Sequence, residues 1–509
     1  MADRRRRARI RQASVFFAVA LFPFLARAAA TEPLRILMDA PPQTINPRLT
    51  QDASGQRIAA LLFPALTRLD SRLRVEGDLA EAIRPDAEFR RWRFKIRTGV
   101  KDHLGAPLGG AELLECFQNY RETRPLAVAI QALEPWKSLR LQGRELVFDL
   151  EKPDPFFSRN VSLLRYFRQE GRPPCTDPVA DKPLTGAGEF RAAVGARPPE
   201  DELVVERHRA DGTFSPHARL IFVRDENTRV IRMLRGEADI SQNAFSPVRF
   251  RWLVAKHPHE FRLVEAPGVN VSYLSFNLRH PVLAHPRVRR ALALAIPVQG
   301  LVEKKFAAMV EPASSFLSPL LEDAATPPSL REDPAEAARL LDEAGFPRRG
   351  GAPRFRLTFK TTPVREGYET VRILQEAYSK LGIDVRLEVV EPAVLLAATR
   401  KGSYEIALGR WVGVADPSIL ERTLRSGGTS NRAGYADPGM DRLLDRRDWR
   451  SVQLKMAEDL PYFPLWFWKN AVLLRKGFGG IDASQLSLSG ALRPLMDIRR
   501  EGPGPGGKE

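Results

Sequence analysis

The residue types that most often carry out chemistry do not form a known catalytic pattern in this chain. The sequence has no G-x-S-x-G nucleophile motif, no H-E-x-x-H motif, no G-x-x-x-x-G-K-[ST] phosphate loop and no C-x-x-C pair. Seven histidines are dispersed, and only His257 and His259 lie close together. Two ligands without a third favour a solvated loop over a metal centre. We therefore expect a protein that is not an enzyme and has no cofactor or metal site.

The amino terminus has the pattern of an export signal. A cluster of arginines between positions 4 and 11 precedes an apolar run at 15–25, and small residues follow at 26–30. The run is shorter than the roughly 20 apolar residues that a membrane span needs. This arrangement predicts a signal peptide over residues 1–30, which directs export by the Sec or the Tat route and is cleaved by a signal peptidase, and a periplasmic mature protein.

Two cysteines, Cys116 and Cys175, remain in a chain bound for an oxidising compartment. Cys116 falls in a predicted helix at 110–120, and Cys175 follows two prolines in a loop. The sequence alone leaves both a disulfide and two buried free thiols open, because pairing depends on the folded distance between the two residues.

Charge and length describe a large exported protein rather than a nucleic-acid binder. The formal net charge is +17, and removal of residues 1–30 takes away seven arginines and one aspartate, which leaves +11. The remaining arginines are scattered, and no basic stripe alternates with aromatic residues, so we expect no nucleic-acid partner. A mature chain near 480 residues has room for two or three domains, at roughly 100 to 200 residues per domain.

Strand and helix patterns alternate along the chain, which is typical of an α/β protein. Alternating apolar residues predict strands at 34–38, 92–97, 202–207 and 219–223. A helix is expected over 334–344, with Asp333 as its N-cap, Pro334 in its first turn and Gly345 just beyond its end. Strand 355–359, helix 369–381, strand 385–389 and helix 392–400 follow in order. The tail at 502–509 is rich in glycine and proline and is predicted to be disordered.

Several of these segments resemble, in order, the family 5 solute-binding proteins of ABC importers, the dipeptide and oligopeptide type. The resemblance rests on short blocks: L-A-E at 79–81, W-R-F-K-I-R-T-G-V-K at 92–101, L-R-G-E-A-D-I at 234–240, Y-L-S-F-N at 273–277, P-R-V-R-R-A-L-A-L-A-I at 286–296, A-A-R-L-L-D-E-A-G-F at 337–346, Trp411 with Asp416 and Pro417, and L-P-Y-F-P-L at 460–465. Each block alone is weak, and their order along nearly the whole mature chain carries the resemblance.

The resemblance implies a periplasmic-binding-protein-like type II clamshell, an α/β fold of two lobes with mixed sheets plus an extra α/β domain. The expected divisions are lobe I at 31–72, 183–268 and 478–501, the extra domain at 73–182, and lobe III at 269–477. A small-molecule or short peptide solute would bind between the lobes of a monomer, and hinge closure would present it to ABC permease and ATPase subunits in the inner membrane. A sensor or chaperone module without an importer, a nickel-type metal binder and a binder of another non-peptide solute are the alternatives.

The same resemblance suggests five substrate-binding residues, each with a structural alternative. Trp411 is expected to form a pocket wall rather than core, and Asp416 stands beside it. Tyr273 faces either the solute or the core. Asn277 either contacts solute or caps backbone at a hinge, and Asn46 either contacts solute or forms a turn before a proline.

One departure from the family bears on the solute. Peptide binders of this type often carry an aspartate a few residues after the pocket tryptophan, where it holds the ammonium group of the peptide. Here apolar residues and glycine fill 412–415, so the amine clamp is absent unless Asp416 turns inward. We therefore expect a divergent member whose solute is not an ordinary peptide.

Overall fold

The structure is a computed structural model that describes residues 32–122, 130–133, 135–179, 182–192, 200–208, 214–486 and 490–501. The predicted signal peptide and the predicted C-terminal tail lie outside these residues. Within the described ranges, no helix has both the length and the apolar character that crossing a membrane requires.

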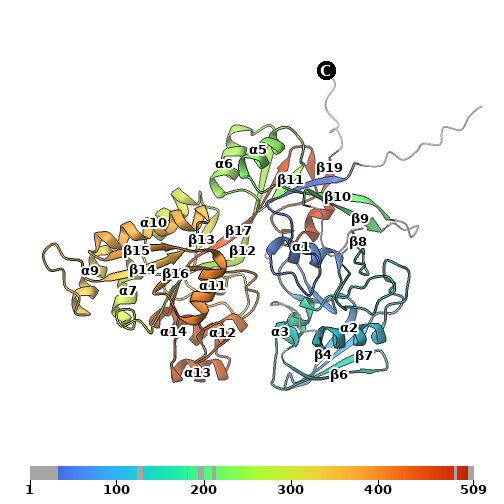
Figure 1. The fold of residues 1–509 in the computed structure, drawn as a ribbon, viewed down its shortest axis with the longest axis horizontal. Coiled ribbons are helices and arrows are strands. Elements are labelled where there is room, and N and C mark those ends of the chain that lie inside the picture. Colours follow the sequence, from blue (N-terminus) through green and yellow to red (C-terminus); the bar gives the residue numbers. More distant parts are fainter. Residues whose placement is uncertain are drawn as a thin grey trace, which may run out of the picture.

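One mixed sheet of eleven strands runs through the described part of the molecule (Figure 1). Its order is β15 (Asp384–Val389), β14 (Arg356–Thr361), β16 (Ile406–Trp411), β12 (Phe261–Phe276), β17 (Tyr462–Arg475), β11 (Ile240–Gln242), β1 (Leu34–Met38), β10 (Phe214–Phe222), β9 (Glu202–His208) and β8 (Phe190–Arg191), with β13 (Val310–Pro312) on β17. We call the part built on β1 and β8–β11 the β1 half, and the part built on β14–β16 the β16 half.

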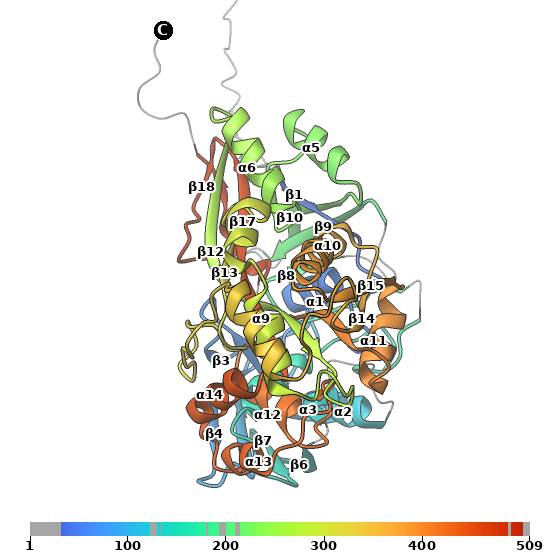
Figure 2. The ribbon, with the colours of Figure 1, turned by 90° about the vertical axis from the view of Figure 1, so that its left-hand side faces the viewer.

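The two halves are joined by β12 and β17, which pair antiparallel along both halves and run side by side in the turned view (Figure 2). Their register shifts between Ala266 and Asn270, so the intervening residues form a bulge. Gly268 lies in this bulge, and a Cβ there would stand 2.1 Å from the carbonyl oxygen of Trp468. The crossing between the halves therefore requires glycine, because the two backbones approach too closely for a side chain.

Helices of the β1 half begin where the sequence supplies capping residues. Helix α1 (Ala53–Leu62) starts after Asp52, whose side chain accepts from the Gly55 amide, and α5 (Glu226–Leu234) starts after Asp225 in the same manner. Helices α5 and α6 (Pro247–Lys256) lie beside β11 at one end of this half (Figure 1). The remaining short elements of this half are β2 (Thr67–Leu69), β3 (Val75–Gly77), η1 (Val161–Leu163), β18 (Phe478–Gly479), η3 (Arg493–Asp497) and β19 (Arg499–Arg500).

A separate four-stranded antiparallel sheet carries much of the segment expected to form the extra domain. Its order is β4 (Ala80–Pro85), β5 (Arg91–Ile96), β7 (Glu145–Leu150) and β6 (Trp136–Gln142), with α2 (Gly110–Glu122), α3 (Ile130–Leu133) and α4 (Phe157–Asn160) nearby. Buried Phe94 and Phe148 of this sheet belong to the same core cluster as Ile36 of β1 and Ile58 of α1. Because this core is continuous, we count the small sheet with the β1 half.

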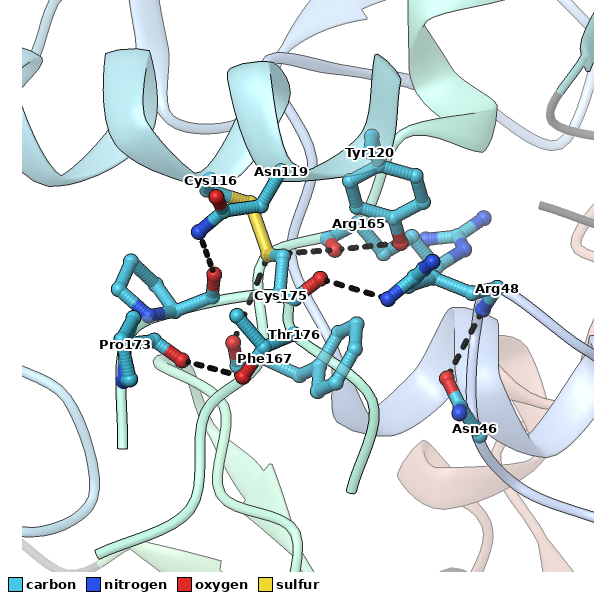
Figure 3. Close-up of a disulfide and its surroundings, with 11 residues drawn as sticks. Asn46, Arg48, Cys116, Asn119, Tyr120, Arg165, Phe167, Pro173, Cys175 and Thr176 are labelled. Atoms are coloured by element: carbon cyan, nitrogen blue, oxygen red, sulfur yellow. Dashed lines mark hydrogen bonds between the residues drawn. A yellow bond between two sulfur atoms is a disulfide. The ribbon is translucent and has the colours of Figure 1, made fainter. Parts of the chain in front are cut away.

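A disulfide joins Cys116 of α2 to Cys175, with Cα atoms 4.9 Å apart, and this answers the question that the sequence left open (Figure 3). The carbonyl oxygen of Cys175 accepts a hydrogen bond of 3.1 Å from the Arg48 guanidinium. Arg48 also pairs with Asp177 at 3.0 Å and has its guanidinium carbon 5.8 Å from the centre of the Tyr120 ring. The disulfide is thus tied to the segment that links β1 to α1.

In the β16 half, apolar side chains cover both faces of the sheet. One cluster includes Leu274, Phe359 and Leu374, and a second includes Tyr273 and Tyr462. Helix α9 (Pro334–Glu343) begins at Pro334, as predicted from the sequence. The other helices are α7 (Pro286–Leu294), α8 (Val298–Gly300), η2 (Leu301–Lys305), α10 (Arg365–Lys380), α11 (Pro392–Lys401), α12 (Ser418–Leu424), α13 (Pro438–Asp445) and α14 (Trp449–Asp459).

Candidate functional site

A cavity of about 1680 Å³ lies between the two halves. One wall is formed by the β1–α1 segment, α1 and the residues around α4, and the facing wall is formed by the end of β16 and the loop that leads into α12. This volume exceeds the roughly 300 to 1,000 Å³ of pockets for drug-sized ligands. The cavity is therefore large enough for a solute of several residues.

Trp411, the last residue of β16, lines this cavity and is held by its neighbours. Its ring stacks on Tyr273 with centroids 5.4 Å apart and planes 16° apart. The Arg432 guanidinium carbon lies 4.6 Å from the Trp411 ring centre, and Arg432 donates a 3.1 Å hydrogen bond to the Tyr273 hydroxyl. Gly409 makes room for this stack, because a Cβ there would be 2.5 Å from Cζ of Tyr273. The tryptophan is thus a fixed apolar wall.

Two details of this wall bear on recognition. The indole Nε1–H of Trp411 is buried and has no hydrogen-bond partner among the described residues, so it is an unsatisfied donor of this wall. Burial also raises the pKa of the Tyr273 hydroxyl, which keeps that group neutral.

Asp416 also lines the cavity, but its carboxylate already has partners within the protein. Its Oδ1 accepts a 2.8 Å hydrogen bond from the amide of Ser418, at the start of α12. Its Oδ2 lies 3.4 Å from Nε of Arg159, which comes from α4 in the other half. Arg159 also donates to the carbonyl oxygen of Ala415. The side chain of Asp416 is 10% exposed, so this carboxylate connects the two halves and is largely withdrawn from solvent.

Of the five predicted site residues, Trp411 and Asp416 line the cavity, and Tyr273 packs behind the tryptophan. Asn277 is 5% exposed and does not belong to the cavity lining. Its Nδ2 donates to the carbonyl oxygens of Gly402 (2.9 Å) and Tyr404 (2.6 Å). This is the backbone-capping arrangement that was one of the two expectations for Asn277.

Asn46 is fully buried and also lies outside the cavity lining. Its Oδ1 accepts a 3.0 Å hydrogen bond from the Arg48 amide, and its own amide donates to the hydroxyl of Thr44 at 3.1 Å. These contacts form a turn, which was the structural alternative considered for Asn46. The turn shapes the β1–α1 segment, whose neighbouring residues Pro47 and Thr50 do line the cavity.

Sequence reasoning did not identify Arg57, which lines the cavity from α1. The guanidinium donates to Oε1 of Gln242 on β11, and its buried Nε has no hydrogen-bond partner among the described residues. Desolvation lowers the pKa of Arg57 to about 10. In a chain with 79 lysines and arginines, no local pattern distinguishes this arginine from the others.

The described residues contain no group of three or more His, Cys, Asp and Glu side chains placed to hold a metal ion. His257, one of the two neighbouring histidines, has its Nδ1 3.0 Å from Oε1 of Glu260, and neither histidine of the pair lines the cavity.

Two bodies joined by two long strands around a large cavity define a clamshell binding protein, and comparison with known proteins identifies the family. The family model for bacterial extracellular solute-binding proteins, family 5, middle part, matches residues 74–431. The chain therefore belongs to the family 5 bacterial extracellular solute-binding proteins. The predicted fold class, a periplasmic-binding-protein-like type II clamshell, is confirmed.

Individual relatives are distant but similar over most of their length. The chain is 24% identical over 448 residues to the glutathione-binding protein GsiB of Salmonella paratyphi A, which covers 81% of this chain and 78% of that protein. It is 21% identical over 501 residues to the oligopeptide-binding protein OppA of Bacillus subtilis, covering 88% and 90% of the two chains. The structure of NikA from Brucella suis in complex with Fe(III)-EDTA matches with a TM-score of 0.77 at 20% identity, covering 92% of this chain and all of NikA.

Proposed function

We propose that this protein is the periplasmic solute-binding component of an ABC importer and that it captures a peptide or peptide-like solute. The observation that carries the proposal is the large cavity. Its two walls belong to different halves, and β12 and β17 join these halves. A solute that contacts both walls stabilises the closed arrangement, and closure is the signal that a membrane permease can recognise. The relatives named for glutathione and oligopeptides support this class of solute.

The protein needs no chemical step for this role. Trp411 offers a rigid apolar surface, and residues of the opposite wall provide polar groups. We infer that the protein acts as a monomer without enzymatic activity and that permease and ATPase subunits perform the transport. A sensor or chaperone role without an importer uses the same binding step and differs only in the partner.

The proposal is tested with the purified mature protein and a library of peptides, blocked peptides, sugars and metal ions. A matched solute should raise the melting temperature, because a ligand that binds only the folded state adds about 2.7 kcal/mol of stability at a hundredfold excess over Kd. Deletion of the gene should then abolish uptake of that solute. No thermal shift with any compound would contradict the proposal, and binding without any loss of uptake would favour the sensor role.

A further inference from the structure

The wall opposite Trp411 holds a cation that the protein itself does not neutralise. Arg57 stands on α1 and reaches Gln242 of β11, and its side chain lines the cavity. Two buried donors at this point, Nε of Arg57 and Nε2 of Gln242, have no hydrogen-bond partner among the described residues. Gln242 is 3% exposed, so solvent does not satisfy its amide.

Four other arginines that line the same cavity differ from Arg57 in having carboxylate partners. Their shortest nitrogen–oxygen distances are 2.7 Å for Arg68 with Glu76, 3.4 Å for Arg159 with Asp416, 2.8 Å for Arg410 with Glu366 and 2.6 Å for Arg493 with Glu189. Among the described residues, Arg57 forms no ion pair within 4.0 Å, and the exposed Asp39 influences it only from farther away.

The chemistry of these groups favours one kind of ligand. A guanidinium has five N–H donors and no acceptor, and its planar fork matches the two oxygens of a carboxylate. A desolvated charge without a partner is unfavourable, and a ligand of opposite charge relieves that cost. Arg57 carries a single positive charge, which one carboxylate balances. The amide Nε2 of Gln242, a residue next to Arg57 but outside the cavity lining, is a further donor without a partner among the described residues.

We propose that Arg57, positioned by Gln242, forms a carboxylate subsite of the cleft and that the solute carries a carboxylate bound there. This proposal rests on the proposed function, because it assigns the solute class of the same cavity. It also places the two ends of the solute: the carboxylate binds the β1 half, and another part of the solute lies against Trp411 on the β16 half.

The test compares acetyl-trialanine with a free C-terminal carboxylate and the same peptide with a C-terminal amide, by titration calorimetry. The wild type should bind the acid form about ten to a hundred times more tightly, which is the range for a hydrogen bond to a charged group. Arg57→Gln should bind both forms equally weakly. Arg68→Gln is the matched control, since Arg68 also lines the cavity but is paired with Glu76, and it should preserve the discrimination.

A second measurement separates a binding role from a structural one. Because Arg57 is an unpaired desolvated cation, Arg57→Gln should not lower the melting temperature of the solute-free protein. A marked loss would mean that the residue holds the fold together, and it would overturn the proposal.

The outcomes distinguish this proposal from the proposed function. Equal binding of the acid and amide forms by the wild type would overturn the carboxylate subsite and leave solute capture intact. Absence of binding for both forms would contradict the peptide class. In that case the subsite is tested by comparing the melting temperature in sodium acetate with that in sodium chloride at the same ionic strength. Acetate should stabilise the wild type and not Arg57→Gln, and an equal response of both proteins would overturn the proposal.

Discussion

Removal of the disulfide between Cys116 and Cys175 should strongly destabilise the protein. The two cysteines are 59 positions apart, and the chain-entropy model gives about 4 kcal/mol for a closed loop of this size. Both side chains are fully buried, so alanine is the appropriate replacement at each position. The Cys116→Ala/Cys175→Ala double variant should therefore lose about 4 kcal/mol of unfolding free energy, within a usual range of about 2 to 5 kcal/mol.

The loss is measured by equilibrium unfolding in urea, from the shift of the midpoint multiplied by the slope of the transition. Wild-type protein reduced with dithiothreitol provides the matched control and should behave as the double variant does. The backbone carbonyl of Cys175 accepts a hydrogen bond from Arg48, and the disulfide fixes the position of that carbonyl. The variant should therefore also loosen the β1–α1 segment that lines the cavity and weaken solute binding. Two titratable thiols in the oxidised wild type, or a loss below about 1 kcal/mol, would refute this reasoning.

Three further predictions concern the cavity and pH. Trp411→Ala should weaken solute binding at least tenfold through lost stacking surface, and unchanged affinity in calorimetry would remove Trp411 from the site. Asp416→Asn breaks the pair with Arg159 that joins the halves, so the radius of gyration from X-ray scattering should increase, whereas solute affinity should fall strongly only if the solute carries an amine. Burial lowers the pKa of His103 from 6.5 to about 4, and its Nδ1 accepts from the Gly186 amide. Between these two pH values the unfolded chain binds more protons than the folded protein, so the unfolding free energy should fall as the pH drops through this window. In urea unfolding, the decrease in unfolding free energy from pH 7 to pH 5 should be smaller for His103→Asn than for the wild type, and an equal decrease would contradict this assignment.

The local elements were predictable from the sequence because their causes are local. Asp333 accepts from the amide of Glu336 and Pro334 occupies the first turn, so α9 begins where a capping residue and a proline predict it. Gly345 follows the helix at φ 89°, a conformation that glycine adopts without a steric penalty. The alternating pattern at 92–97 likewise gives β5, whose alternate residues are buried.

The partners of the cavity residues were not predictable, because they lie far apart in the sequence. The carbonyl of Ala415 and the guanidinium that binds it are separated by 256 positions, and Arg57 and Gln242 by 185. No period or motif encodes such a pair. The sequence therefore suggested Asp416 as an acidic residue near Trp411 without showing that Arg159 already pairs with it. Asn277 and Asn46 show the same limit, since family blocks placed them near a site while their amides bond to nearby backbone.

The energetics of closure explain why both walls of the cavity matter under the proposed function. Moving a two-state equilibrium from 1:99 to 99:1 takes about 5.5 kcal/mol of preferential binding. A charge-assisted hydrogen bond to Arg57 contributes about 1.5 to 3 kcal/mol, and an aromatic contact with Trp411 about 0.5 to 1.5 kcal/mol beyond the area it buries. Neither contribution alone reaches the required value, and their sum of about 2 to 4.5 kcal/mol leaves the remainder to the apolar area that the solute buries. A solute that contacts only one half binds without closing the molecule, whereas a solute that spans the cavity can use both contributions. The bulge at Ala266–Asn270 lies where β12 passes between the halves, so bending there would disturb few paired residues.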